Sequence, residues 1–468
     1  MPRRTETGLT QEESTISRRR FIRTGSVVAA AVAGGLAERS AAGAPPPYET
    51  GQPPSAQPSP LGTGPASGPQ LPAPLTMQPI TAPTEREQEY APTALPPERR
   101  VGIAIVGLGR LSLEELLPAF GEAKRCKVTA LVTGDRPKGL RVAQQYGVKE
   151  SSVYDYKTYD RIADNPEVDV IYIVLPNGMH AEYTVRGAKA GKHILCEKPM
   201  ANSVRECEQM IQACKEANRK LMIAYRIQYE PFNNAVKKMV RASLGEGDRS
   251  KAELGQVKLM TMSNTQHQGG DLTQWRLDKA LAGGGALPDI GLYCLNTARF
   301  LTGEEPTEIS GAQVYSTPGD PRFREVDETV NWLMRFPSGI MANCSTSYAA
   351  HNAKRYRVYG SNAWADMDPA FAYSGLRLQI GRKSLSDPQA EGIEDRRMEQ
   401  KNQFALEMDH MAACVQENKI PYTPGEEGLQ DQRLMEAIYE AGRTGKTVKL
   451  PKIEKRDAFR GDLPKENA

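Results

Sequence analysis

Apolar residues follow two different rhythms along this chain, and the change of rhythm predicts two domains. From residue 101, short runs of β-branched and apolar residues alternate with stretches of helical spacing. Continuous apolar strands separated by helices are typical of a parallel sheet covered on both faces. The expected strands are 101–106, 128–133, 169–175, 193–197 and 221–224, and the expected helices lie near 113–122, 137–147, 178–190 and 203–218.

After Tyr225 the pattern becomes one of strands joined by short turns. In one of these segments the apolar residues Val330, Trp332, Met334 and Phe336 alternate with Asn331, Leu333 and Arg335. Such alternation predicts a mainly antiparallel sheet with one packed face. The expected strands are 256–265, 308–317, 328–336, 339–349, 354–360 and 375–381. Two late helices near 402–417 and 427–442 either cover the edge of this sheet or return to the first domain.

The N-terminus carries the pattern of an export signal. Arg18 and Arg19 are followed by Phe21 and Arg23, then by an apolar run from 24 to 37 and the small residues 42–44. This resembles a twin-arginine signal peptide over 1–44, whose pathway exports folded proteins. The apolar run is too short for a permanent membrane span. We therefore expect a periplasmic protein handled by the twin-arginine machinery; the alternative is a basic tail with a short helix.

Residues 45–97 form a separate segment, because they contain sixteen of the 34 prolines and almost no aliphatic periodicity. Such a composition predicts an extended, polyproline-like chain without a core of its own. It is either a spacer or an arm that lies across a partner subunit. The remaining boundaries follow from the change of rhythm, with a dinucleotide-binding domain over 98–224 and a second domain over 225–468.

Charge and cysteine content narrow the class of protein. The first 44 residues hold seven arginines and four glutamates, which account for the whole formal charge of +3. The rest of the chain is balanced, which argues against nucleic acid as the main partner. The seven cysteines lie mostly in apolar segments without C-x-x-C spacing, and no two of the five histidines have zinc-ligand spacing. We expect buried thiols and no metal.

A glycine-rich loop follows the first expected strand directly. It reads Gly107-Leu108-Gly109-Arg110-Leu111-Ser112 and opens a helix. Glycines at this place allow a tight turn and let a pyrophosphate approach the backbone at a helix N-terminus. Ser112 stands where a third glycine is usual, and its small side chain still permits close packing. The motif is weak alone and strong after a buried strand.

The end of the second strand bears on the choice of cofactor. Thr133 ends the strand, and Arg136 and Lys138 follow just beyond it. A hydroxyl and two cations suit the 2′-phosphate of NADP, whereas NAD-binding folds usually place a carboxylate here. Asp135 keeps open the alternative that a carboxylate reaches the ribose. The pattern favours NADP over NAD.

Two further motifs supply candidate catalytic residues. Lys198 follows the fifth strand in Cys196-Glu197-Lys198-Pro199, at the strand end where ligands bind in parallel sheets. Asp289 and Tyr293 lie four residues apart, so on a helix they share a face. Taken singly, each has an ordinary structural alternative: an ion pair for Lys198, a helix cap for Asp289 and a core position for Tyr293.

Together with the glycine loop, these motifs resemble the glucose–fructose oxidoreductase, inositol dehydrogenase and rhizopine-catabolism (Gfo/Idh/MocA) superfamily, and within it the glucose–fructose oxidoreductase branch. The likeness runs from about residue 101 to the C-terminal helices. It includes 175–182 (Leu-Pro-Asn-x-x-His-Ala-Glu), 196–201, 225–231 and Trp275-Arg276-Leu277. The resemblance implies an α/β fold, with an N-terminal Rossmann domain and an α+β domain built on a large, mainly antiparallel open sheet. It also implies a homodimer or homotetramer formed through that sheet.

The resemblance further implies tightly bound NADP that is reduced by one sugar and reoxidised by another. Tyr293 would be the general acid/base, Lys198 the cation beside it, and Asp289 would orient Lys198 or the sugar hydroxyls. Many superfamily members have histidine at the position of Tyr293, so tyrosine favours the oxidoreductase branch. By the same resemblance, the cofactor cleft would be lined by Tyr156, Asn177, His180, Glu197, Arg226, Trp275 and Arg276. The alternatives are a dehydrogenase with exchangeable cofactor, an enzyme using two aldoses, and a sugar-sensing protein without catalysis.

Overall fold

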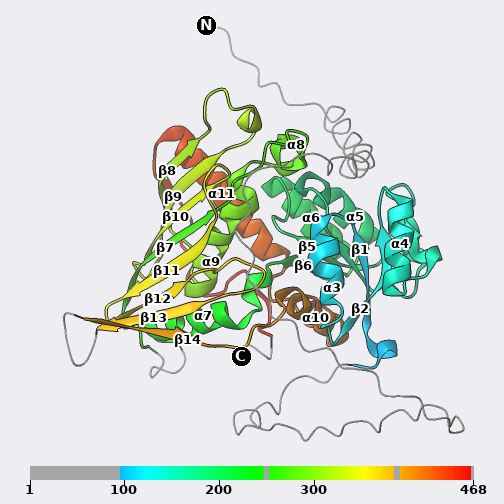
Figure 1. Cartoon of the computed structure of the whole chain (residues 1–468), viewed down its shortest axis with the longest axis horizontal. Coiled ribbons are helices and arrows are strands. Elements are labelled where there is room, and N and C mark those ends of the chain that lie inside the picture. The colour runs from blue at the N-terminus through cyan, green and yellow to red at the C-terminus, as the bar shows by residue number, and fades with distance from the viewer. Residues whose placement is uncertain (1–94, 247–251, 384–389, 465–468) are drawn as a thin grey trace, which may run out of the picture. The chain divides into compact units, whose positions relative to one another are not determined.

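The computed structural model describes residues 95–246, 252–383 and 390–464. These residues form two sheets, coloured blue to green and green to orange in Figure 1. The predicted export signal and nearly all of the proline-rich segment lie outside the described residues. Within the described ranges, no helix has both the length and the apolar character that crossing a membrane requires.

The first sheet has six parallel strands in the order β3-β2-β1-β4-β5-β6. This is the strand order of a Rossmann sheet, in which ligands bind where the order reverses. Its strands are β1 (Val101–Val106), β2 (Cys126–Val132), β3 (Val153–Tyr154), β4 (Val170–Ile173), β5 (His193–Glu197) and β6 (Leu221–Ala224). Every residue of β1, β4 and β6 is buried, which explains their continuous apolar sequences.

Helices follow the strands as predicted, with one irregular start. After β1 comes a π-helical turn (Ser112–Leu116) that runs into α3 (Leu117–Ala119). The others are α4 (Arg136–Tyr146), α5 (His180–Lys189) and α6 (Val204–Glu216). The carboxylate of Asp135 caps α4 by accepting a hydrogen bond from the Lys138 backbone N–H at 3.0 Å.

The second sheet has nine strands in the order β14-β13-β12-β11-β7-β10-β9-β8-β15. All neighbours are antiparallel except β10 and β7, which are parallel. Its strands are β7 (Val257–Thr265), β8 (Glu308–Tyr315), β9 (Thr329–Arg335), β10 (Met341–Ser347), β11 (Ala353–Gly360), β12 (Ala363–Met367), β13 (Leu378–Lys383), β14 (Glu391–Arg396) and β15 (Val448–Lys449).

One face of this sheet is packed and the other is open. In β9 the predicted alternation is confirmed, with Val330, Trp332 and Met334 buried and Leu333 exposed. The packed side carries α7 (Pro231–Ser243), α9 (Leu292–Thr302) and α11 (Gly425–Thr444) (Figure 1). The short helix α8 (Lys279–Ala282) precedes α9 along the chain, and α10 (Gln403–Gln416) contacts the first sheet at β1 and β2. Of the two late helices, α11 therefore packs on the second sheet and α10 contacts the first. All seven cysteines are buried and none forms a disulfide.

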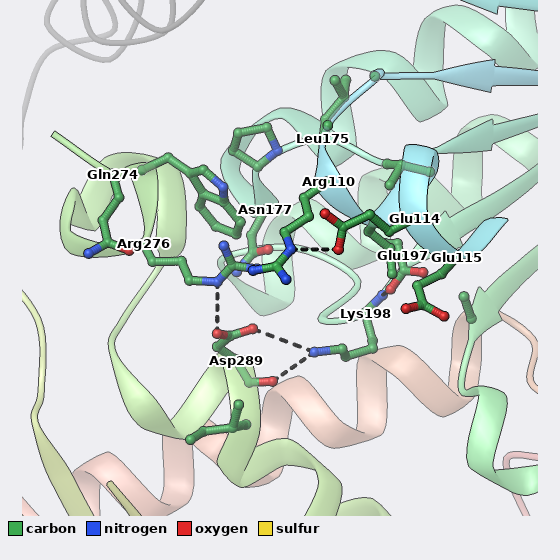
Figure 2. Close-up of a pocket in the computed structure, with 18 of the residues that line it drawn as sticks. Arg110, Glu114, Glu115, Leu175, Asn177, Glu197, Lys198, Gln274, Arg276 and Asp289 are labelled. Carbon is green, nitrogen blue, oxygen red and sulfur yellow. Dashed lines mark hydrogen bonds and ion pairs between the residues drawn. The ribbon is translucent and has the colours of Figure 1, made fainter. Parts of the chain in front are cut away.

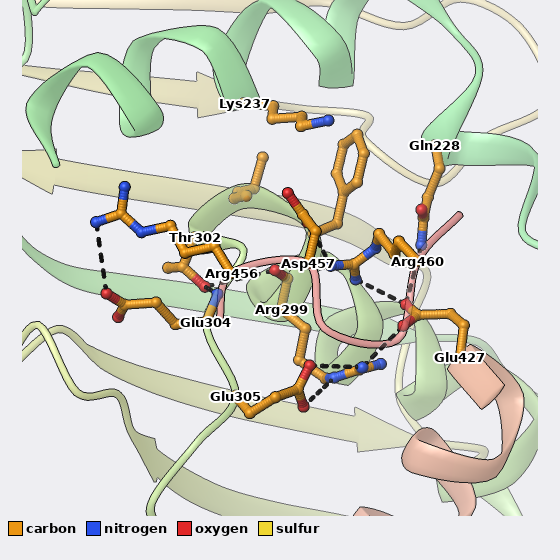
Figure 3. A network of polar contacts seen from close by, with 12 residues as sticks. Gln228, Lys237, Arg299, Thr302, Glu304, Glu305, Glu427, Arg456, Asp457 and Arg460 are labelled. Atoms are coloured by element: carbon orange, nitrogen blue, oxygen red, sulfur yellow. Dashed lines mark hydrogen bonds and ion pairs between the residues drawn. The ribbon is translucent and has the colours of Figure 1, made fainter. Parts of the chain in front are cut away.

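A buried ion cluster fastens the end of the described chain to the helices (Figure 3). The fully buried Arg299 guanidinium contacts Glu305 and Glu427, each at 2.8 Å, and also Asp431. Arg460 reaches the same Glu427 at 2.7 Å. Carboxylates so deeply buried are tolerated because each is paired with a cation.

Candidate active site

A cleft of about 910 Å³ lies where the C-terminal ends of the strands of the first sheet meet segments of the second sheet. This is the size of pocket that small ligands occupy. Most of the predicted site residues line it, and Figure 2 shows several of them. The predicted residues in the lining are Gly107, Leu108, Gly109, Arg110, Leu111, Thr133, Lys138, Tyr156, Asn177, Glu197, Lys198, Arg226, Trp275, Arg276, Asp289 and Tyr293.

The glycine loop has the shape that a bound pyrophosphate needs. Gly107 has a φ of +100°, and a Cβ there would lie 2.2 Å from the Val174 carbonyl oxygen. A Cβ on Gly109 would meet no atom within 4 Å, so this side of the loop is open. The buried Ser112 hydroxyl donates to the Gly107 carbonyl at 2.6 Å and closes the turn. The loop therefore leaves bare backbone facing the cleft at the start of a helix, which fits a dinucleotide phosphate.

Three residues at and after the end of β2 were predicted to hold a 2′-phosphate, and two of them line the cleft. Thr133 and Lys138 line the cleft, with the Lys138 ammonium donating to the Leu108 carbonyl at 3.0 Å. Arg136 does not line it, because its guanidinium contacts the Val153 carbonyl at 3.1 Å and Glu150 at 3.3 Å. Asp135 also borders the cleft, but its carboxylate caps α4.

His180 is a second predicted cofactor residue that the structure places elsewhere. Its ring is fully buried beneath the cleft, and its two nitrogens lie 2.9 Å from the carbonyl oxygens of Leu175 and Pro199. Burial lowers the pKa of the imidazole. The ring thus ties together the two loops that follow β4 and β5 and does not line the cleft.

The three predicted catalytic side chains converge in the cleft. Lys198 follows β5, Asp289 lies on a π-helical turn (Leu287–Gly291), and Tyr293 lies in the first turn of α9. The Lys198 ammonium donates to the Asp289 carbonyl at 2.7 Å and lies 3.6 Å from its carboxylate (Figure 2). It also lies 4.7 Å from the centre of the Tyr293 ring. Asp289 thereby orients Lys198.

Asp289 remains ionised because two cations and one hydroxyl donor surround its carboxylate. Its carboxylate accepts hydrogen bonds from Arg276 at 2.9 Å and from the Tyr348 hydroxyl at 2.6 Å. Burial raises the pKa of this carboxyl, but Arg276 and Lys198 outweigh burial and bring the pKa to about 2. For Lys198, burial lowers the pKa, while Tyr293 and Asp289 raise it above its ordinary value. Both groups are therefore charged at neutral pH.

The cation that contacts the Tyr293 hydroxyl is Arg226, while the predicted cation Lys198 lies beside the ring. The buried Arg226 guanidinium donates to this hydroxyl at 3.1 Å and to the Phe371 carbonyl at 2.7 Å. Lys198 lies over the ring face because Asp289 holds its ammonium. The phenol is thus flanked by two cations, one at its hydroxyl and one over its ring face.

Sequence analysis missed the residues that the second sheet contributes. The cleft is also lined by side-chain amides at the end of β7 and just after it, together with Lys354 of β11 and the aromatic Tyr373. Gln266 donates to Gln268 at 3.2 Å, and Gln268 in turn donates to Gln274. Only the polar run 264–268 after an apolar strand signals these residues in the sequence. Side-chain amides both donate and accept, which suits uncharged hydroxyl groups.

Comparisons with known proteins agree with this geometry. The GFO/IDH/MocA family described as "Oxidoreductase family, NAD-binding Rossmann fold" matches residues 101–225. The GFO/IDH/MocA C-terminal domain matches residues 250–366. Both matches fall on the part of the chain that carries the two sheets.

Individual relatives cover most of the chain. A D-xylose 1-dehydrogenase (NADP(+)) of Haloarcula marismortui is 32% identical over 353 residues, which is 75% of this chain and 93% of the relative. The crystal structure of an aldose-aldose oxidoreductase from Caulobacter crescentus, complexed with glycerol, is 43% identical. It has a TM-score of 0.69 and covers 75% of this chain and 100% of its own. The chain therefore belongs to the Gfo/Idh/MocA family of oxidoreductases with an NAD(P)-binding Rossmann domain.

Proposed function

We propose that this protein is an NADP-dependent sugar oxidoreductase acting on CH–OH groups. The observation that carries the proposal is the convergence of Lys198, Asp289 and Tyr293 in the cleft that contains the glycine loop. The names of two relatives support it, since one is a D-xylose dehydrogenase using NADP and another is an aldose-aldose oxidoreductase. The amide-lined wall from the second sheet suits a neutral, hydroxyl-rich substrate.

The residues present fit NADP at identifiable places. The open backbone at Gly109 would face the pyrophosphate, and Thr133 and Lys138 would hold the 2′-phosphate. The bound nicotinamide supplies the hydride acceptor and donor that side chains lack. Tyr293 takes the proton from the sugar hydroxyl that is oxidised, and Lys198 hydrogen-bonds the same oxygen. Asp289 orients Lys198, and Arg226 stabilises the phenolate that the proton transfer requires.

The proposal extends to a cofactor that stays bound between two sugars. A glucose-like aldose is oxidised to its lactone, and a second sugar, fructose-like or an aldose, is reduced to its polyol in a ping-pong cycle. The export pattern at 1–44 supports this, because an exported enzyme works where free NADP is scarce. We place the protein in the periplasm, as a homodimer or homotetramer joined through the open face of the second sheet.

The second candidate is a dehydrogenase whose NAD(P) exchanges during each turnover. The D-xylose 1-dehydrogenases of Haloarcula marismortui and Haloferax volcanii, 32% and 25% identical, favour it by name. The export pattern favours the retained cofactor. A sugar-sensing protein without catalysis is disfavoured by the complete set of Lys198, Asp289 and Tyr293.

Steady-state kinetics without added cofactor test the proposal. The purified protein is given glucose together with fructose, or with a second aldose, and lactone and polyol are measured. Equal amounts of both products, with parallel lines in double-reciprocal plots, are expected. Products that form only after NADP or NAD is added would favour the dissociable-cofactor dehydrogenase.

A further inference from the structure

A chain of three buried side chains runs from the cleft into the interior behind it. Glu197 at the end of β5 lines the cleft, Tyr172 lies on β4, and Glu407 lies on α10. The Tyr172 hydroxyl lies 2.9 Å from a carboxyl oxygen of Glu197 and 2.9 Å from one of Glu407. Both Tyr172 and Glu407 are completely buried. A contact of this kind joins the C-terminal part of the chain to the wall of the Rossmann cleft.

The number of hydrogen atoms that Glu197, Tyr172 and Glu407 can donate decides which carboxyl group is protonated. A phenol donates one hydrogen bond, and an ionised carboxylate donates none. Two carboxylates on one hydroxyl would leave one contact repulsive, in a buried place where bulk solvent cannot screen it. Both contacts are favourable only when one carboxyl group keeps its proton and donates it to the Tyr172 oxygen.

The surroundings identify Glu407 as the protonated partner. Glu197 accepts the Lys198 backbone N–H at 3.2 Å and lies next to that lysine in the chain. The other carboxyl oxygen of Glu407 has no hydrogen-bond partner. The charged and titratable groups that act on Glu407 are Glu197, Tyr172, Arg226 and Tyr229. Burial raises the pKa of Glu407 well above its ordinary value and Glu197 raises it further, outweighing Tyr172 and Arg226, which lower it. Burial also raises the pKa of Glu197, but there Lys198 and Tyr172 lower it.

We propose that Glu407 is a positioning residue, held as a neutral carboxylic acid, which through Tyr172 fixes the Glu197 carboxylate at the wall of the cofactor cleft. Glu407 donates to the Tyr172 oxygen, and Tyr172 donates to Glu197. The two carboxyl groups then share a single negative charge, which lies on Glu197, the one that faces the cleft. The oriented carboxylate is an acceptor suited to the hydroxyl groups of a bound dinucleotide. This inference rests on the proposed cofactor binding, and not on which sugars are used.

Infrared spectroscopy tests the protonation state directly and without cofactor. The wild-type protein at neutral pH should show a band of a protonated carboxyl group that is lost in Glu407→Gln. The matched control is Glu426→Gln, which replaces an exposed glutamate and should leave this band unchanged. If the spectrum of Glu407→Gln retains every protonated-carboxyl band of the wild type, Glu407 is ionised and the proposal is overturned.

Cofactor retention tests the positioning role. The rate of NADP loss from the loaded protein is followed by nicotinamide fluorescence. Glu407→Gln keeps a neutral donor, so its rate should stay within about twofold of the wild type. Tyr172→Phe and Glu407→Leu remove the hydrogen bonds that link the three side chains, and both variants should release NADP about tenfold faster. If Glu407→Gln releases NADP as fast as Tyr172→Phe, or if Tyr172→Phe retains it like the wild type, the positioning role is overturned.

The two measurements also separate this inference from the proposed function. Should Glu407→Leu fail to fold, the Gln and Phe variants decide the outcome. A wild-type protein that binds no NADP would contradict the proposed function and remove the positioning role with it. The infrared result would still stand as a test of the neutral carboxyl group.

Discussion

At the scale of single residues, Tyr293 is distinguished by the two cations around it. Arg226 donates to its hydroxyl, while Lys198 lies over its ring face under the control of Asp289. The two cations thus have separate tasks. In the proposed reaction, Arg226 contacts the phenolic oxygen that exchanges the proton, and Lys198 contacts the substrate oxygen.

Tyr293→Phe tests the assignment of the acid/base. Loss of the hydroxyl should lower kcat by about a thousandfold, since proton transfer by a positioned group contributes that order of magnitude. NADP binding should be unchanged, because the ring remains. The control Tyr315→Phe removes a hydroxyl from an exposed tyrosine of β8 and should leave kcat unaffected. A fully active Tyr293→Phe enzyme would show that another group transfers the proton.

We propose that cofactor choice depends on Lys138 and not on Arg136, because only Lys138 lines the cleft. Lys138→Ala should raise the Kd for NADP about tenfold and leave the Kd for NAD unchanged, because only NADP carries the 2′-phosphate. Arg136→Ala is the matched control, since its guanidinium contacts Val153 and Glu150 outside the cleft. Equilibrium titrations with both cofactors measure the four constants. An equal loss for NADP in both variants would place Arg136 at the cofactor after all.

Sequence motifs located Lys198, Asp289 and Tyr293 because they lie in short, ordered patterns at the ends of predicted elements. The contact of Arg226 with Tyr293 has no such signal, because the two residues are 67 positions apart and meet only in the folded chain. His180 and Arg136 were misplaced for a related reason. A motif gives the residue type and the loop, but not the direction of the side chain.

At the scale of elements, the glycine loop offers a matched pair of substitutions. Gly107→Ala should destabilise the protein by more than about 1 kcal/mol, because its φ is positive and its methyl group would collide with the Val174 carbonyl. Gly109→Ala meets no neighbour, so stability should be kept while NADP binding is lost. Chemical denaturation and cofactor titration separate the two effects. Normal NADP affinity in a folded Gly109→Ala variant would remove the loop from the cofactor site.

The strands with clear apolar patterns were predicted within a few residues, and three of the missed elements, β14, β3 and α9, lack such patterns. The helix α7 was missed although its apolar residues recur at helical spacing. The strand β14 is exposed at nearly every position, and β3 has only two residues. The helix α9 is buried on almost all sides, so its sequence shows no polar face. Hydrophobic periodicity reveals elements that have one packed side. The strand β14 has no packed side, and the helix α9 is packed on several sides.

The C-terminal segment should contribute strongly to stability through Arg460. Its side chain is 1% exposed, and its guanidinium pairs with the fully buried Glu427. Arg460→Ala leaves that carboxylate with one cation fewer and should lower the free energy of unfolding by about 3 kcal/mol. Arg433→Ala, which breaks an exposed pair with Glu208, should cost less than about 1 kcal/mol. If urea denaturation gave equal losses of unfolding free energy for the two variants, the buried cluster would not contribute the expected extra stability.

At the scale of the whole molecule, the two sheets divide the work of the site. The Rossmann sheet provides the glycine loop and Lys198, and the second sheet with its helices provides Asp289, Tyr293 and the amide-lined wall. The arrangement of these parts followed from the family resemblance more than from periodicity. The roles of the export signal and the proline-rich segment stay predictions, since both concern residues outside the described ranges.

We propose that NADP stays bound while two sugars react in turn. An absorbance spectrum of the purified, exhaustively dialysed protein, recorded before and after adding glucose without cofactor, tests it most directly. We predict a rise of the reduced-nicotinamide band to one equivalent per chain, reversed by fructose or a second aldose. A spectrum without any nicotinamide signal, in a protein that becomes active only when NADP or NAD is supplied, would contradict the claim.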